Sequence, residues 1–552
     1  MSKPRTTPAP TTLELPFLLA ELPSSQHRAG LAGLVLTIHE LERRRSRPPG
    51  ILELVDLRPA GVTLRVDQPG LATLFDTIYK AERVPREVDK PFPKTEPDGE
   101  RQFEELDAKG KLKLRTKYIY NLVRPDGACQ RSWDLQDTPA VEGMWVKLWR
   151  DMVWNILRGV PAQREPFNDR ADHKPPRDVA GVWDSLQRPG ATIPLPSTYF
   201  LGAQAVTAEN VDFTDLARDQ LLLHFWSFAA PIYVPRLVTI GPDGAPKYEF
   251  DDYVLAIPDI GDLVRYCEIL PDMLRARTTE RTGYRPREAV VDLPAESALS
   301  ALVALRAQLR VRHARADIVD VIHGVDAFHV GKDGNNVRIR HVVRVDPVGP
   351  LLDEYDQIHR ALWNPLFRRQ LLGNRLAGRP WHSGFDRLLT TTPWKHVLGD
   401  SHYFAHDART APTLFPDAAM TTEDPTTEPT TTASMIYSMV RTYLSRKLAR
   451  KHDLEWDAVK DDPRRKADYN DKKEHLAREA FLAIRSRTGD DFVEYFTATL
   501  CSVPHYIPED RFVHIAHKLH DGDGRDELRT LTLLALSAHG SAPKSKEAKE
   551  PA

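Results

Sequence analysis

The sequence predicts an α+β protein: a large mixed α/β region that begins with a ferredoxin-like β-α-β-β-α unit, followed by an all-α helical bundle. Three observations support this. Strand-like and helix-like runs alternate over residues 13–415, residues 416–434 cannot form a core, and residues 435–540 carry apolar side chains only at helical spacing. The polar ends, residues 1–12 and 541–552, are predicted to be disordered tails.

Composition narrows the possible classes of protein. The chain has 552 residues, of which 41% are hydrophobic and 28% charged, as expected for a globular protein with real cores. The net charge of −2 gives no overall basic field, so any nucleic-acid site must be a local patch. Cys129, Cys267 and Cys501 match no zinc or disulfide spacing. No apolar run is long enough to span a membrane, and a cytoplasmic location is expected.

The ferredoxin-like unit is predicted over residues 13–81. A strand candidate covers residues 13–22, and Ser24 or Ser25 can cap a helix with apolar residues at helical spacing. Two strands at 51–57 and 62–66 flank a turn, and a second helix follows over 71–80. The aromatic signature of RNA-recognition domains is absent from these strands, so the topology alone says nothing about binding.

The start of the first helix contains Gln26, His27 and Arg28. Free backbone N–H groups and the helix dipole favour an anion at such a position, so these three residues are candidate phosphate contacts. Helix capping alone would also explain the serines that precede them.

Residues 82–111 are polar and interrupted by prolines, which predicts a mobile insertion. A strand is expected over 112–123 and an amphipathic helix over 144–158, whose tryptophans we interpret as core residues. Between 180 and 350 strands and helices alternate. Within this part, a turn at Lys332, Asn335 and Asn336 is a candidate for reading groove acceptors of duplex DNA, and an ordinary exposed turn is the alternative.

The clearest boundary is the segment 416–434, which holds seven threonines and three prolines but no lysine, arginine or aromatic residue. It predicts a linker between the mixed body, 13–415, and a helical bundle, 435–540. The first helix of that bundle carries basic residues opposite its apolar stripe, which suits sequence-independent phosphate contacts: Arg441, Arg446, Lys447 and Arg450.

Residues 357–399 combine many arginines with interleaved aromatic side chains. Arginine pairs with phosphates and aromatic faces stack on bases, so this composition favours a groove for single-stranded nucleic acid. The alternative is a solvated basic face above an ordinary aromatic core. The candidate contacts are Arg368, Arg369, Arg375, Arg379 and Trp381.

His402, His406 and Asp407 have a spacing that could bind a metal ion, as in metal-dependent phosphohydrolases and nucleases. In a chain with 20 histidines such pairs also arise by chance. The sequence contains no phosphate-binding GxxxxGK[ST] loop, no nucleophile elbow and no paired-cysteine zinc motif.

Several strings resemble the large subunit of type I CRISPR effector complexes (Cascade), in the Myxan branch grouped with subtype I-B. Near the N-terminus these are Glu21-Leu-Pro-Ser-Ser-Gln-His-Arg-Ala-Gly-Leu-Ala-Gly-Leu, Trp145-Val-Lys-Leu-Trp-Arg-Asp-Met-Val-Trp-Asn and Gly159-Val-Pro-Ala. Near the C-terminus they are Asp491-Phe-Val-Glu-Tyr-Phe, Cys501-Ser-Val-Pro and Leu533-Leu-Ala-Leu-Ser-Ala-His. The resemblance spans nearly the whole chain but supplies no short functional motif.

The resemblance implies a non-catalytic subunit without a cofactor, acting in antiviral defence. Such proteins help hold the 5′ end of the guide RNA, inspect the protospacer-adjacent motif (PAM) on duplex DNA, and help open the duplex into an R-loop. Their expected partners are guide RNA, target DNA with its displaced strand, the backbone and small subunits, and a helicase-nuclease recruited in trans. In some relatives the C-terminal part is also made separately by internal translation, for which Met435 and Met439 are candidate starts.

Two rival functions remain open from sequence. One is a metal-dependent phosphohydrolase or nuclease that uses His402, His406 and Asp407. The other is a scaffold that binds no nucleic acid.

Overall fold

The computed structural model describes residues 12–44, 49–106, 112–138, 140–157, 164–195, 201, 213–240, 246–334, 336–399, 403–415, 431–502 and 509–540. The chain divides into two compact units. The first comprises Met1–Pro235 and Phe250–Val348, and the second comprises Arg236–Glu249 and Gly349–Ala552. The predicted tails lie outside the described residues, apart from Thr12.

The first unit begins with the predicted β-α-β-β-α order, and its three strands form an antiparallel sheet in the order β1-β3-β2. Ser24 caps the first helix by accepting a hydrogen bond from the His27 N–H, and Asp67 caps the second through Gly70. The elements are β1 (Leu13–Leu18), α1 (Ser25–Arg43), β2 (Leu52–Arg58), β3 (Gly61–Val66) and α2 (Gln68–Ile78).

Helix α1 is the most deeply packed helix of this opening segment, with buried residues on nearly all sides. Two glycines permit this packing. A Cβ at Gly30 or Gly33 would collide with the backbone carbonyl oxygens of Leu222 and Phe225. Leu222 is the last residue of α7 (Ala217–Leu222) and Phe225 precedes α8 (Trp226–Ala229), so glycine lets α1 approach this segment at backbone distance.

A second antiparallel sheet runs in the order β9-β11-β15-β16, with β14 parallel to β9. All residues of β11 are buried, and both α1 and α10 contact this central strand. The elements are β9 (Ile232–Ile240), β11 (Tyr253–Ile260), α9 (Leu263–Arg275), β14 (Val290–Val291), α10 (Glu296–Arg312), β15 (Ile322–Asp333) and β16 (Asn336–Val345).

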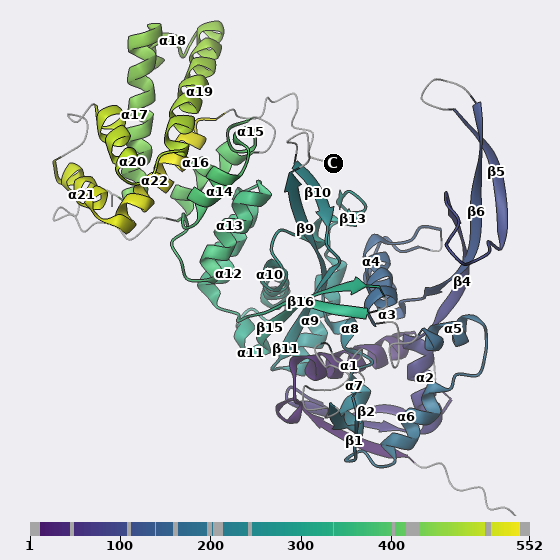
Figure 1. Cartoon of the computed structure of the whole chain (residues 1–552). Coiled ribbons are helices and arrows are strands. Elements are labelled where there is room, and N and C mark those ends of the chain that lie inside the picture. The colour runs from purple at the N-terminus through teal and green to yellow at the C-terminus, as the bar shows by residue number, and fades with distance from the viewer. Residues whose placement is uncertain are drawn as a thin grey trace, which may run out of the picture. The chain divides into compact units, whose positions relative to one another are not determined.

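Residues 82–111, predicted as a mobile insertion, differ from that expectation because they carry two strands. These are β4 (Ala81–Val88) and β5 (Gly99–Leu106), which pair with the two edges of β6 (Leu112–Pro125). Pro85 is tolerated because β4 is an edge strand, where a missing N–H costs no ladder bond. β5 and β6 extend away from the rest of the first unit (Figure 1), and we call this sheet, residues 81–125, the arm.

Strand β10 (Pro246–Phe250), most of which belongs to the second unit, pairs with β9. Shorter elements complete the first unit. The shorter elements are η1 (Leu19–Glu21), α3 (Ala128–Trp133), α4 (Met144–Met152), the π-helix η2 (Val153–Leu157), α5 (Glu165–Ala171), α6 (Asp178–Leu186), β7 (Thr192–Pro194), β8 (Thr214–Leu216), β12 (Arg281–Thr282), β13 (Arg285–Pro286), η3 (Arg287–Ala289) and α11 (Ile318–Val321).

The second unit is helical from residue 349 onward within its described part. Residues 416–430 of the predicted linker lie outside the described residues, and α17 begins at Thr432. Helices on both sides of that segment pack together, since α14 and α16 both contact α22. The helices are α12 (Gly349–Ala361), α13 (Pro365–Leu376), α14 (Phe385–Thr391), α15 (Trp394–Leu398), α16 (Phe404–Leu414), α17 (Thr432–His452), α18 (Trp456–Val459), α19 (Pro463–Arg485), α20 (Gly489–Tyr495), the π-helix η4 (Phe496–Leu500), α21 (Glu509–His520) and α22 (Gly522–Ser537).

Candidate nucleic-acid interface

Three of the four basic residues predicted on α17 line one surface pocket. Arg446, Lys447 and Arg450 face Thr499 and Ser502 at the end of η4, and Tyr443 and Ala498 complete the lining. No acidic side chain belongs to this lining in the part of the chain that the structure describes. We call this group the basic pocket.

The helix register explains why these side chains gather. The buried stripe of α17 includes Ile436, Val440, Leu444 and Leu448, as the sequence predicts, and it leaves the basic residues at the surface. Opposite them the chain passes from α20 into a π-helical turn, a local widening that is frequent at functional sites.

The chemistry of the basic pocket suits a phosphate. The Lys447 ammonium lies 4.8 Å from the centre of the Tyr443 ring, which positions it by a cation–π contact. Burial raises the pKa of Tyr443, so its hydroxyl stays protonated at neutral pH. Three cations beside hydroxyl groups can contact a nucleic-acid backbone without reading its sequence.

Arg441, the fourth predicted residue, belongs to a different cluster. It is exposed and lies near Lys473 of α19, Arg409 of α16 and His539, which follows α22. Burial and then the nearby cations lower the pKa of Lys473, and the same causes lower the pKa of His539 to about 3. These residues are far apart in sequence, and no local pattern could have grouped them.

The predicted groove over residues 357–399 is divided between core and surface. Trp381 is only 1% exposed, so its ring is not available for stacking on a base. Arg375 donates two hydrogen bonds to the Glu354 carboxylate, at 2.8 and 2.7 Å. This ion pair neutralises the positive charge of Arg375. Arg368 is half-buried, with Nη2 3.4 Å from His359 Nδ1. Arg369 and Arg379 are exposed.

Gln26, His27 and Arg28 are engaged within the first unit. Gln26 Oε1 accepts a hydrogen bond of 3.1 Å from the backbone N–H of residue 201, and His27 Nε2 lies 2.8 Å from Asp215 Oδ2. Arg28 forms an ion pair with Asp259 of β11 and donates to the Leu19 carbonyl at 2.9 Å. These contacts tie the start of α1 to its neighbours, which is a structural role.

The turn between β15 and β16 is a hairpin whose backbone pairs Asp333 with Asn336. Gly334 has a positive φ of 60°, and Lys332 is exposed. Asn335 lies outside the described residues, as does the side chain of Asn336.

Aspartates balance the arginines of β16. Arg338 contacts Asp333 at 2.9 Å, and Arg344 contacts Asp259 at 2.8 Å. The body of this hairpin therefore presents little net positive charge.

Two side chains of the candidate metal site, Asp407 and His406, already have other partners within the chain. Asp407 is fully buried and accepts hydrogen bonds from the backbone N–H groups of Trp363 and Asn364, at 3.0 and 2.7 Å. His406 Nδ1 lies 3.0 Å from Asp407 Oδ1, and its ring stacks on Trp363 at 4.2 Å. His402 lies outside the described residues, and within them no three side chains are grouped to hold a metal ion.

Two family models match the chain in tandem. The type I-B CRISPR Cas8b N-terminal domain matches residues 51–315, and the Cas8b C-terminal domain matches residues 322–539. The chain belongs to the Cas8b family. It is therefore a large subunit of type I-B Cascade. No curated protein matches it in sequence.

The two Cas8b matches are separated by residues 316–321, which contain α11, and the C-terminal match begins with β15. The compact units divide later, between Val348 and Gly349. The C-terminal match therefore includes β15 and β16 of the first unit as well as nearly all described helices of the second. No helix in the described part of this Cas8b chain has the length and apolar character needed to cross a membrane.

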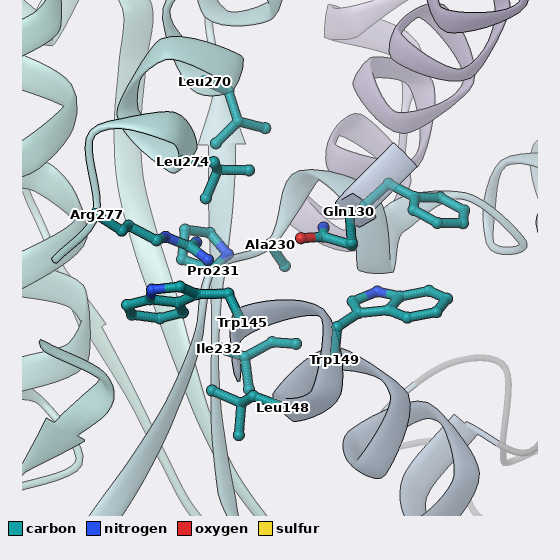
Figure 2. A pocket seen from close by; sticks show the side chains of 11 residues that line it. Gln130, Trp145, Leu148, Trp149, Ala230, Pro231, Ile232, Leu270, Leu274 and Arg277 are labelled. Atoms are coloured by element: carbon teal, nitrogen blue, oxygen red, sulfur yellow. The ribbon is translucent and has the colours of Figure 1, made fainter. Parts of the chain in front are cut away.

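The first unit of this Cas8b protein also contains a narrow pocket (Figure 2). Its lining includes Trp145 and Trp149, which the sequence assigned to the core and which are 7% and 2% exposed. The Arg277 guanidinium lies 4.1 Å from the centre of the Trp145 ring, and Gln130 points toward the same space. Burial lowers the pKa of Arg277 to about 10, so it remains charged at neutral pH.

Proposed function

We propose that this chain is a non-catalytic Cascade subunit that contacts nucleic-acid backbones through its second unit and reads the PAM through a turn of its first unit. In this proposal it helps hold the 5′ end of the guide RNA, recognises the PAM, promotes R-loop formation and recruits the helicase-nuclease. The family assignment supports membership of the complex. The basic pocket is the observation that supports nucleic-acid binding, because it gathers three cations beside the hydroxyl groups of Tyr443, Thr499 and Ser502, with no acidic side chain in its lining among the residues that the structure describes.

The basic pocket fits the displaced DNA strand better than the duplex. Its cations come from one helical face, and its partners Thr499 and Ser502 come from one turn, so the site is compact and suits a single backbone. Guide pairing reads the target sequence in RNA-guided effectors, so protein contacts to the displaced strand need no base specificity; the general case is known from a different, single-protein effector. The exposed Arg441 and Arg409 extend the positive surface available to the same strand.

The experiment that tests the proposal is co-expression of the tagged chain with the other type I-B subunits and a guide RNA. We expect a particle that carries guide RNA and binds PAM-bearing target DNA more tightly than DNA without the motif. A particle that assembles without RNA would favour the scaffold alternative and refute the proposal.

PAM recognition is assigned to the turn at Lys332, Asn335 and Asn336, where a hairpin tip can approach a groove. Asn335→Ala combined with Asn336→Ala should lower the ratio between PAM-bearing and PAM-less affinity. An unchanged ratio in an assembled particle would exclude this turn as the reader.

The metal-dependent enzyme is the second candidate, and the contacts of Asp407 count against it. The two oxygens of this buried carboxylate already receive four contacts, from the Trp363 N–H to both oxygens, from the Asn364 N–H and from His406 Nδ1, which leaves little capacity for a cation. We expect the particle without its helicase-nuclease to leave DNA intact in the presence of divalent metal ions. Cleavage that is lost in His406→Ala would overturn this assignment.

A further inference from the structure

The arm extends beyond the support of the first unit. At about 3.3 Å per residue, β6 spans roughly 45 Å. Helix α5 packs against β4 and β6, but β4 ends opposite Tyr118, so the outer part is a ribbon of β5 and β6 alone. Residues 112–115 of this ribbon are all exposed. A two-stranded ribbon is at best marginally stable by itself in water.

One face of the arm is balanced in charge. Strand register places Glu105, Arg115 and Lys117 on this face, together with Phe103. Arg115 contacts Glu105 at 2.7 Å, and the Lys117 ammonium lies 5.2 Å from the centre of the Phe103 ring. Glu87 is within 3.7 Å of the same lysine. The charges on this face are therefore satisfied by its own neighbours.

The other face is apolar and acidic. Leu112 and Leu114 are each 65% exposed, and Tyr118 lies further along the same face. Glu104 lies directly across from Leu114, and Glu100 lies across from Tyr118. Both glutamates are exposed and form no ion pair among the described residues. We call these five residues the leucine face.

The chain itself covers this face at the base of the arm. Phe92 stacks against Tyr120 with ring centres 4.3 Å apart, and the Tyr120 hydroxyl accepts a hydrogen bond from the Phe92 N–H at 2.9 Å. Nothing in the described part of the chain gives Leu112 and Leu114 the same cover. The apolar surface thus continues past the point where the chain stops covering it.

We propose that the leucine face docks on another protein subunit of the effector complex, on apolar side chains flanked by lysine or arginine. This inference rests on the proposed function. Glu100 and Glu104 would repel a nucleic-acid backbone, and the two leucines offer no ring on which a base can stack. The one ring of this face, Tyr118, lies directly across from Glu100. A second copy of this chain would bring the same two glutamates against each other in a two-fold contact. A protein surface with apolar side chains and a rim of lysine or arginine would cover the leucines and pair with the glutamates.

The test compares variants of the full chain co-expressed with the other subunits and a guide RNA. Leu112→Ser with Leu114→Ser removes the apolar contact, and Glu100→Lys with Glu104→Lys reverses its acidic rim. Lys113→Ser with Arg115→Ser is the matched control, because these residues alternate with the leucines and point to the opposite face. We expect both leucine-face variants to retain one partner subunit at least about tenfold more weakly, and the control to match the wild type.

Each other outcome overturns the inference. Unchanged subunit composition in both leucine-face variants, with wild-type thermal unfolding, would show that this face is not a docking site. Equal loss in the control would assign the effect to the ribbon as a whole. Loss of guide RNA with all protein subunits retained would make the occupant a nucleic acid, and recovery of an untagged copy with the tagged chain would make it this chain. A wild-type chain that recovers no partner would refute the proposed function itself.

Discussion

Neutralising the basic pocket should change how DNA binding depends on salt. The perturbation replaces Arg446, Lys447 and Arg450 by glutamine, which keeps side-chain length and removes three cations from one lining. Each phosphate contact to a single strand adds about 0.7 to the slope of log affinity against log salt, so the variant slope should be shallower by about 2. Between about 50 and 200 mM salt the wild type should therefore lose roughly 20-fold more affinity than the variant.

The assay measures target DNA binding by the assembled complex over that salt range. Two targets separate the strands: a full duplex, and a target from which the displaced strand has been omitted. The shallower slope is expected only with the full duplex. Arg464→Gln, Arg465→Gln and Lys472→Gln form the matched control, because these residues are exposed on α19 of the same unit and lie outside the pocket lining.

An unchanged slope in a variant with wild-type thermal unfolding would refute the assignment of the pocket to a nucleic-acid backbone. An equal reduction on both targets would show that the pocket contacts a strand other than the displaced one. An equal reduction in the control would show that general net charge, rather than the pocket, sets the salt dependence.

Three further predictions concern stability. Asp407→Asn should raise hydrogen exchange at the amides of Trp363 and Asn364 about 30-fold, because an amide donor facing a buried N–H costs about 2 kcal/mol. Unchanged exchange there would show that the Asp407 carboxylate does not hold these two amides. Burial lowers the pKa of His224 from 6.5 to about 3, so below pH 6.5 the unfolded chain protonates this side chain while the folded protein keeps it neutral. The free energy of unfolding is therefore unaffected by the titration of His224 above pH 6.5 and falls below it, by at most about 1.4 kcal/mol per pH unit. Thermal unfolding of the wild type should therefore fall more steeply between about pH 6.5 and 4 than that of His224→Gln. A fragment starting at Met435 should unfold at a much lower temperature than one starting at Gly349. It lacks the backbone carbonyls before residue 435 to which Tyr437 and Arg485 donate hydrogen bonds. Equal melting temperatures of the two fragments would refute this prediction.

Local patterns predicted the elements that have one buried side. The β-α-β-β-α opening, the hairpin at residues 58–61 and the stripe of α17 each follow from apolar spacing along a single element. Within the arm, β6 follows the strand predicted over residues 112–123, whereas β4 and β5 escaped prediction for the same reason. Its ribbon has no buried face at its outer end, so β5 shows no apolar alternation and reads as polar sequence with neighbouring prolines. Only pairing with β6 makes it a strand.

The candidate site was predictable where one helix supplies it. Arg446, Lys447 and Arg450 follow from spacing on α17, whereas Arg409, Lys473 and His539 come from separate elements and carry no shared sequence signal. Composition alone was misleading over residues 357–399. There the aromatic side chains that suggested a stacking surface include Phe367, Phe385 and Trp381, all of which are buried. A basic-aromatic composition cannot distinguish a binding groove from a core beneath a charged surface.

Several residues of the strings that resemble Cascade large subunits are packing residues, which explains why those residues indicate a family but no site. Gly30 and Gly33 sit where a Cβ would strike another backbone, and Trp149 stacks on Phe228 in the interior. Such positions accept few side chains, so they make a specific signature. The basic pocket and the leucine face lie at the surface, where packing imposes no such restriction. Membership of the family and the location of its contacts are therefore separate questions, and charge-specific substitutions at these two surfaces address the second.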